Sequence, residues 1–295
     1  MSEQNPTPVV VAVGHDPIDA ALGVAAGEAA RAGCGLHLVH VVHLLARGPE
    51  NGASGEVPAE RKGRLLLDAA ADRARGLAPA GVPVTSELHV GAVVPTLVDL
   101  TKDARLIVLG HRELSGLRRV VTRSVSSGVA AHARVPTVAV PAGWSPPSSD
   151  ERPPTVAVGL DVPDRGREVL RVAFDAARAR GATLRIVHTW HLPSPYEDLV
   201  VARSVDEEWA ARATDEIRAV LDTLGDETAG VPVEIEARAS RAADALVEAG
   251  RHSDLLVVGR HDPAVPIGSH LGPVARAVLG EAVCPLLIAD PRRHD

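Results

Sequence analysis

The sequence Gly81-Val82-Pro83-Val84 recurs 149 residues later as Gly230-Val231-Pro232-Val233. Two further segments repeat at the same offset: an apolar run that ends in glycine, and a proline that precedes a second apolar run. These pairs are Leu106–Gly110 with Leu255–Gly259, and Val135-Pro136 with Cys284-Pro285. Solenoid repeats span about 20 to 50 residues, whereas whole domains span about 100 to 150 residues. The chain therefore contains two copies of one domain, and any site is to be sought twice.

The composition excludes several classes of protein. The 295 residues are 45% hydrophobic and 23% charged, which suits two globular cores. Aromatic residues make up 2%, too few for stacking on single-stranded nucleic acid, and the net charge of −7 opposes binding to a phosphate backbone. Cys34 and Cys284 lie in different copies and indicate neither a disulfide framework nor a metal site. Without an apolar run long enough to span a bilayer or a signal-peptide core, we expect a cytoplasmic protein that binds neither nucleic acid nor membrane.

Strand and helix patterns alternate along each copy. Short β-branched runs open the copies at Val9–Val13 and Thr155–Val158, and Ala-rich helical stretches follow over about residues 20–32 and 168–180. Four more strands and three more helices follow in the same order in both copies. This alternation predicts right-handed crossovers, and hence an α/β, Rossmann-like fold with an open five-stranded parallel sheet flanked by helices in each copy.

The repeat and the composition between the copies predict the domain boundaries. We assign the first domain to residues 1–145, a linker rich in proline and serine to residues 146–154, and the second domain to residues 155–295. Proline stiffens such a linker. The fifth strands, Thr137–Val140 and Leu286–Ala289, are expected at sheet edges, where an apolar strand needs a partner.

Two loops in each copy are candidates for ligand binding, because ligands of open α/β sheets lie beyond the carboxyl ends of the strands. The loop after the first strand carries Asp161 in copy two. In copy one Gly14 stands at that position, and a carboxylate follows two residues later as Asp16. A carboxylate here can accept hydrogen bonds from an adenine amine or a ribose hydroxyl. The alternative reading, favoured by residue type alone, is that these aspartates cap a turn or a helix start.

The second candidate loop connects the fourth strand to the fourth helix. It runs from Gly259 to Gly272 in copy two and from Gly110 to Arg123 in copy one. A helix N-terminus offers unpaired N–H groups and the positive end of a dipole, and glycine lets the backbone approach a phosphate closely. The pattern is therefore typical of an anion site.

The architecture and these loops resemble the universal stress protein family in its tandem two-domain form, over nearly the whole chain. The strand end His188-Thr189-Trp190 is similar to the His-Ala-Trp strand end of actinobacterial members. The resemblance implies an adenine nucleotide alpha hydrolase-like fold. For the nucleotide-binding branch it implies a motif of Gly, two residues, Gly, nine residues, Gly, then Ser or Thr, with an Asp after the first strand that contacts adenine. It also implies that the two copies pair through their fifth strands, with Val138 and Leu287 near the contact.

Carried over residue by residue, the motif is incomplete in copy two. This copy keeps Asp161, Gly259 and Gly272, but Asp262 stands where the second glycine belongs and Pro273 replaces the hydroxyl residue. Pro273 suits a first helical position but lacks an N–H that could face a phosphate. Further backbone candidates for nucleotide contact lie within the loop and at the helix start: Gly268, Ser269 and Val274.

The motif in copy one departs further from the family pattern. Gly110 and Ser124 are kept, whereas Gly14, Glu113 and Arg123 replace the aspartate and two of the glycines. Arg123 belongs to a group of arginines that can pair with phosphate: Arg112, Arg118, Arg119 and Arg123. The alternative, which we favour, is a solvated basic loop that pairs with local acids such as Glu113.

Three functional hypotheses follow. The first is a stress-response regulatory protein that binds ATP or another adenine nucleotide, mainly in copy two, with Mg²⁺ present only beside ATP. The second is an interaction or scaffold protein whose pockets have decayed. The third, a weak ATPase, has least support, because Asp161 and Asp262 are the only candidates for a water-activating base or for Mg²⁺ ligands. A homodimer and a regulatory protein partner are further expectations. We assign no catalytic residue and no metal site, since His37, His40 and His43 alternate across one strand.

Overall fold

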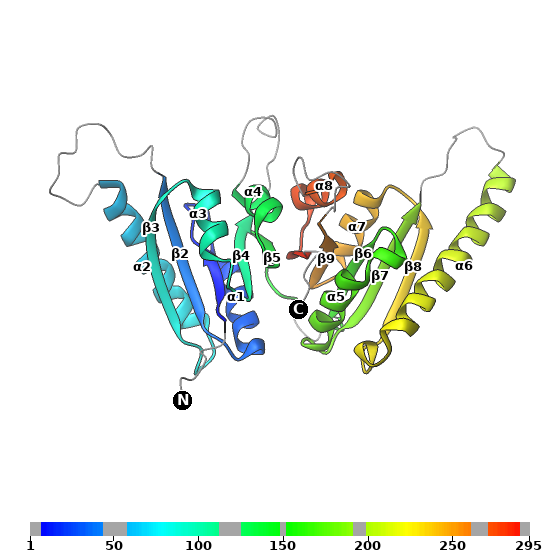
Figure 1. The fold of residues 1–295 in the computed structure, drawn as a ribbon, viewed down its shortest axis with the longest axis horizontal. Helices are drawn as coiled ribbons and strands as arrows, with labels where there is room; N and C mark the ends of the chain where they lie inside the picture. The colour runs from blue at the N-terminus through cyan, green and yellow to red at the C-terminus, as the bar shows by residue number, and fades with distance from the viewer. Residues whose placement is uncertain are drawn as a thin grey trace. The chain divides into compact units, whose positions relative to one another are not determined.

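The computed structural model describes residues 7–43, 58–111, 125–147, 152–190, 199–260 and 271–289. The chain divides into two compact units, Met1–Ser145 and Pro146–Asp295. The units are coloured blue to green and green to red in Figure 1.

The first unit is a parallel sheet covered by helices on both faces (Figure 1). Its strands are β1 (Val9–Ala12), β2 (Leu36–His43), β3 (Val84–Gly91), β4 (Leu106–His111) and β5 (Thr137–Pro141). Its helices are α1 (Asp19–Ala32), α2 (Pro58–Leu77), α3 (Val93–Leu100) and α4 (Val125–His132). The strand order is β3-β2-β1-β4-β5, and every pair is parallel. The order reverses at β1, so the carboxyl ends of β1 and β4 flank the switch point at which ligands bind in such sheets.

The second unit repeats this arrangement. Its strands are β6 (Thr155–Leu160), β7 (Thr183–Trp190), β8 (Val233–Ala239), β9 (Leu255–Gly259) and β10 (Leu286–Ala289). Its helices are α5 (Arg167–Arg178), α6 (Leu199–Leu224), α7 (Ala242–Arg251) and α8 (Pro273–Glu281), with 3-10 turns η3 (Pro163–Arg165) and η4 (Gly225–Thr228). The order is β8-β7-β6-β9-β10, again parallel, with the switch point between β6 and β9. The predicted fold class is confirmed.

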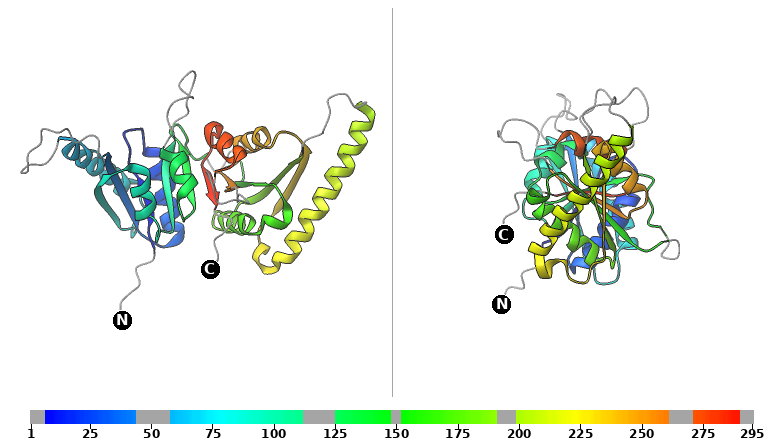
Figure 2. Two further views of the ribbon diagram at one scale, coloured as in Figure 1. Left: turned by 45° about the horizontal axis from the view of Figure 1, so that its top comes forward. Right: turned by 90° about the vertical axis from the view of Figure 1, so that its right-hand side faces the viewer.

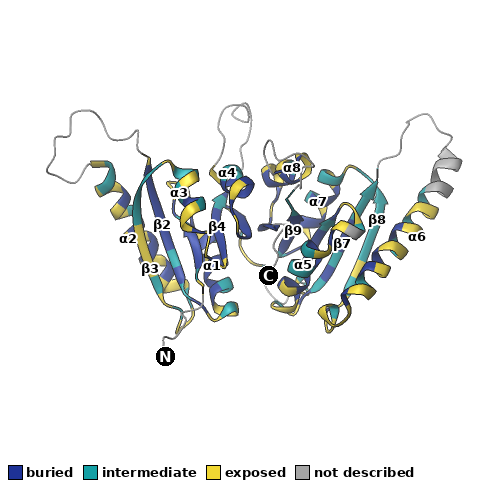
Figure 3. Cartoon of the chain, in the orientation of Figure 1, coloured by how far each residue is buried: buried dark blue, intermediate teal, exposed yellow. Residues whose placement is uncertain are grey.

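Both faces of the central strands are buried, which explains why β1, β4, β9 and β10 are apolar runs, whereas the outer strands β3 and β8 are partly exposed and carry charged residues. In the first unit, Val39 of β2 packs with Leu97 of α3 and Val129 of α4 on one face. On the other face, Gly63 of α2 lies against His40 of β2. Figure 3 shows the buried strands in dark blue and the exposed outer sides of the helices in yellow.

One element boundary agrees with the sequence-based expectation and others differ from it. α1 ends as expected, at Gly33, whose φ of 61° is the left-handed conformation that glycine adopts without strain. β3 begins at Val84 rather than Val82, because the Val82 N–H bonds back to the Pro79 carbonyl in a turn. α6 begins at residue 199, earlier than the expected residue 206. Figure 2 shows α2 and α6 running beside the outer strands β3 and β8 of their own units.

Candidate functional site

The end of β6 is fixed by hydrogen bonding immediately before Asp161. The carbonyl of buried Leu160 accepts a hydrogen bond from His188 Nδ1 of β7, at 2.9 Å. The chain then turns through the exposed Asp161 into η3. A Cβ at Gly166 would lie 2.0 Å from Leu160 Cδ1, so glycine is needed for the loop to fold back over Leu160. The local structure therefore presents the Asp161 carboxylate at the surface beyond the carboxyl end of a central strand.

The same histidine bond occurs in the first unit. His40 Nδ1 of β2 donates to the carbonyl of Val13 at 2.8 Å, and His40 is 6% exposed. The His15 ring lies edge-on to it, with ring centroids 5.8 Å apart. Sequence reasoning considered His40 only as a metal ligand and missed this role. The signal was present in the repeat, because both copies place a histidine in the second strand, beside the end of the first.

The start of α8 is the second part of the site. Gly272 is the N-cap residue in an extended conformation, with φ −64° and ψ 168°, and no side chain of the cap residue closes the helix start. Pro273 occupies the first turn, and the next residue, Val274, is 38% exposed. The positive end of a nine-residue helix therefore begins at this edge of the sheet without a side-chain cap.

An arginine that sequence reasoning did not select lies beside this helix start. Arg276 Nη2 lies 3.5 Å from the carbonyl oxygen of Leu271, so the guanidinium is directed back toward the residue that precedes Gly272. A planar guanidinium carries five donors and pairs well with phosphate. The sequence did carry a signal for this arginine. Arg276 lies one turn into a helix that begins at Pro273, which has no N–H of its own to offer an anion.

The glycine at the end of β9 has a structural explanation. A Cβ on Gly259 would lie 2.8 Å from Val169 Cγ2 of α5, which is closer than real Cβ contacts. The close packing of α5 therefore requires glycine here whether or not a ligand binds. Its counterpart Gly110 differs, because among the described residues a Cβ there would meet the Pro17 carbonyl oxygen at an ordinary 3.5 Å.

In the first unit, a hydrogen bond within the protein joins the start of the fourth helix to the end of the fourth strand. Ser126 Oγ at the start of α4 donates to the Gly110 carbonyl at 3.2 Å, which ties the helix start to the end of β4. Ala275 stands at the matching position of α8 and has no hydroxyl. His111, at the end of β4, is 8% exposed. Gly14 supplies no carboxylate, although no atom lies within 4 Å of where its Cβ would be.

The described residues include five of the nine sequence-predicted site residues. Asp161 and Gly259 lie at the ends of the paired neighbours β6 and β9, Gly272 and Val274 lie at the start of α8, and Gly110 lies in β4. The remaining candidates and two of the motif departures lie outside the described residues: Arg123, Ser124, Gly268, Ser269, Glu113 and Asp262.

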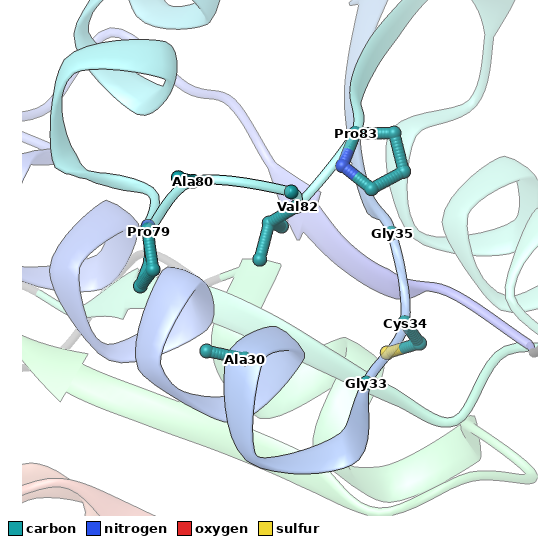
Figure 4. Close-up of a pocket in the computed structure, with 9 residues that line it drawn as sticks. Ala30, Gly33, Cys34, Gly35, Pro79, Ala80, Val82 and Pro83 are labelled. Carbon is teal, nitrogen blue, oxygen red and sulfur yellow. The ribbon is translucent and has the colours of Figure 1, made fainter.

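Other kinds of site find little support. Within the described ranges, no group of three or more His, Cys, Asp or Glu could hold a metal ion. Nor does any helix in that part of the chain combine the length and apolar character needed to cross a membrane. A cavity of about 520 Å³ lies at the opposite end of the first unit's strands, between the end of α1 and the turn before β3 (Figure 4). Its lining is small and uncharged, with Cys34 4% exposed, so it offers no group that pairs with phosphate.

Comparison with known proteins identifies the family. The universal stress protein family matches residues 6–141 and 154–290, one match in each unit. The chain belongs to the universal stress protein family. Universal stress protein Rv2005c of Mycobacterium tuberculosis is 30% identical over 290 residues, which is 95% of this chain and 96% of that protein. Universal stress protein Rv1996 of the same organism is 29% identical over 209 residues, and the match spans 65% of its length.

Solved structures show the same fold. A universal stress protein from Archaeoglobus fulgidus superimposes with a TM-score of 0.64 at 15% identity, covering 95% of this chain and 96% of that chain. A universal stress protein solved in complex with cAMP is 26% identical and covers 47% of this chain and 98% of that chain, with a TM-score of 0.33. The match of the universal stress protein family to both units confirms the predicted family.

Proposed function

We propose that the chain is a stress-response regulatory protein that binds an adenine nucleotide, ATP or AMP, in its second unit. The observation that carries the proposal is the start of α8 at Gly272, which has no side-chain cap and follows β9, whose neighbour in the sheet, β6, leads into Asp161. A helix start of this kind favours an anion, and a carboxylate at the neighbouring strand end suits the nucleoside.

Each part of a nucleotide has a matching group in this arrangement. The phosphates would lie at the N-terminal turn of α8, near the backbone of Val274 and the Arg276 guanidinium. The adenine amine or a ribose hydroxyl would donate to the exposed Asp161 carboxylate. His188 would act indirectly, because its bond to the Leu160 carbonyl holds the chain that leads into Asp161. Mg²⁺ would accompany only ATP.

The difference between the two units favours one site rather than two. In the first unit Ser126 bridges the helix start and the strand end, and Gly14 replaces the aspartate. The second unit has Ala275 and Asp161 at these positions. We therefore expect one nucleotide per chain, in the second unit.

The test is calorimetric titration of the full chain with ATP and with AMP, in the presence of Mg²⁺ and of EDTA. We expect one site per chain, weakened by Asp161→Asn and by Arg276→Ala. Asp16→Asn, in the loop after β1, is the matched control and should leave binding unchanged. Absence of any binding heat, together with no thermal shift on adding nucleotide, would favour the scaffold function instead.

Hydrolysis is tested on the same samples. Phosphate release from ATP that disappears in Asp161→Ala would identify a weak ATPase, and its absence leaves a binding protein. Pairing of the two units through their fifth strands, a homodimer, a regulatory partner and a cytoplasmic location remain predictions from the sequence.

A further inference from the structure

The outer edge of each sheet carries charged and polar side chains at equivalent positions. In the first unit, His37 of β2 is paired in register with Thr85 of the edge strand β3, and Glu87 and His89 follow on the same face. In the second unit, Arg185 of β7 is paired with Glu234 of the edge strand β8, and Glu236 and Arg238 follow in the same way. The register is the same, but the ionisable groups differ.

The first unit has two imidazoles and one carboxylate at these positions. His37 Nδ1 lies 2.8 Å from Thr85 Oγ1, and His37 Nε2 lies 3.7 Å from Glu87 Oε2. His89 Nε2 lies 3.0 Å from the other carboxylate oxygen of Glu87. Because Thr85 is neutral, the two histidines share the single negative charge of Glu87. With both imidazoles neutral the group carries the single negative charge of Glu87, and His37 has no carboxylate of its own to pair with when it takes up a proton.

The second unit has one carboxylate for each cation. Arg185 Nε and Nη2 both lie 3.2 Å from Glu234 Oε2, and Arg238 Nε lies 2.9 Å from Glu236 Oε1. Arginine stays charged throughout the pH range in which histidine titrates. The positive and negative charges at this edge therefore stay equal in number from neutral pH to the acid side of the range in which histidine titrates.

We propose that the β2–β3 edge of the first unit is an acid-sensitive latch, in which protonation of His37, which shares Glu87 with His89, loosens the edge strand β3, while the Arg185–Glu234 pair keeps β8 attached to β7. β3 is hydrogen-bonded to β2 on one side as the outermost strand of its unit, so opening it breaks one ladder of hydrogen bonds together with its packing against α2. The proposal does not depend on nucleotide binding.

The direction of the pH effect follows from the surroundings of His37. Burial lowers the pKa of His37 below its ordinary value of 6.5, the Glu87 charge opposes this, and His89 adds to the lowering. A histidine with a lowered pKa in the folded state takes up a proton more readily when the strand opens. Its contribution to stability is therefore complete above pH 6.5 and is lost as the pH falls below that value toward the folded-state pKa.

Neighbouring elements contribute no further described charge to this cluster. Val10 of β1 lies beside His37 in the sheet. The charged residue of α3, Asp99, is 80% exposed and lies 4.0 Å from Lys102. α2 covers the opposite face, where Gly63 contacts His40 and Val42. The response to acid at this edge therefore belongs to the His37–Glu87–His89 group.

Hydrogen exchange followed by mass spectrometry tests the latch in the full chain. Exchange is measured at about pH 7.5 and about pH 5.5, on either side of the ordinary histidine pKa, and corrected for the intrinsic effect of pH on exchange. Peptides that cover β3 should lose protection at the lower pH, whereas peptides that cover β8 in the same molecules should not. Equal responses of β3 and β8 would overturn the proposal.

Two substitutions separate charge balance from other effects of acid. Thr85→Glu supplies the missing carboxylate opposite His37 and should abolish the loss of protection. Ser86→Glu adds the same charge at the next residue, on the opposite face of β3, and should leave the acid response unchanged. If Thr85→Glu disturbs folding, the double substitution His37→Arg and His89→Arg makes the positive charge permanent, so β3 should be poorly protected at both pH values. An acid response in β3 that survives in the folded Thr85→Glu or double-arginine chain would refute the latch.

Discussion

Replacing Gly259 by alanine tests whether the glycine at the end of β9 serves packing or the ligand. The added Cβ would lie 2.8 Å from Val169 Cγ2, and Val169 is 6% exposed on α5, so neither side can move without disturbing the core. Overpacking of this kind costs about 1 to 3 kcal/mol. The alanine also restricts the unfolded chain, which returns about 0.4 to 1 kcal/mol where the backbone conformation is compatible, and the φ of Gly259 is not positive. We expect the second unit to lose about 1 to 2 kcal/mol in its free energy of unfolding.

The assay is urea unfolding of the nucleotide-free chain, followed by the fluorescence of Trp190 and Trp209, which both belong to the second unit. Gly110→Ala is the matched control, because its Cβ meets an ordinary contact at 3.5 Å. This control should leave the first unit unchanged or stabilise it by about 0.4 to 1 kcal/mol.

A double-mutant cycle identifies the neighbour responsible. Val169→Ala removes the Cγ2 methyl, so the Gly259→Ala substitution should be far less costly in that background, with a coupling energy of about 1 to 2 kcal/mol. If Gly259→Ala in the wild-type background is fully stable and mainly weakens nucleotide binding, the packing explanation is refuted. Gly259 would then be needed for the approach of the ligand.

Three further predictions concern single positions. Burial, with a smaller effect of Asp254, raises the pKa of the Cys284 thiol to about 12. Iodoacetamide at about pH 8 should therefore label Cys284 only after unfolding. Rapid labelling of the folded chain would contradict this. Gly63→Ala should destabilise the first unit in thermal unfolding despite the better helix propensity of alanine, because its Cβ would lie 2.8 Å from His40 Cδ2. Gly23→Ala has open space around its Cβ and should stabilise the first unit by about 1 kcal/mol in the same assay. Ser126→Ala removes the hydrogen bond to the Gly110 carbonyl and should cost the first unit about 1 kcal/mol in urea, a prediction that an unchanged midpoint would reject.

The fold was predictable because its determinants are local and appear twice. Continuous β-branched runs, helical stretches between them and Gly33 at a helix end each specify an element without reference to distant residues. Repetition at a constant offset then gave the domain organisation. Element ends were less accurate where a single hydrogen bond decides them, as where the Val82 N–H turns back to Pro79.

The candidate site was predictable only as a set of positions. The resemblance placed Asp161 and Gly272 correctly at a strand end and at a helix start, but the reason for each residue depends on contacts between distant segments. Gly259 is required by Val169 of a helix about ninety positions earlier in the chain, and no sequence pattern distinguishes that requirement from a phosphate-binding one. Arg276 and His188 had signals in the sequence, but their partners, the carbonyl groups of Leu271 and Leu160, are set only by the fold.

The duplication makes each unit a control for the other, and the differences between them follow a pattern. At the switch point, Gly14 and Ser126 in the first unit correspond to Asp161 and Ala275 in the second, so the second unit keeps a carboxylate and lacks the hydroxyl that bridges the helix start in the first. At the outer edge the relation is reversed, because the first unit carries the titratable cluster and the second carries fixed ion pairs. The Arg185–Glu234 pair joins β7 to β8 with groups that stay charged through the pH range in which histidine titrates. The two proposals concern different units and different edges of their sheets. The two proposals are therefore physically compatible, and each predicts the substitution that would transfer its property: Gly14→Asp with Ser126→Ala toward nucleotide binding in the first unit, and Arg185→His with Glu234→Thr toward acid sensitivity in the second.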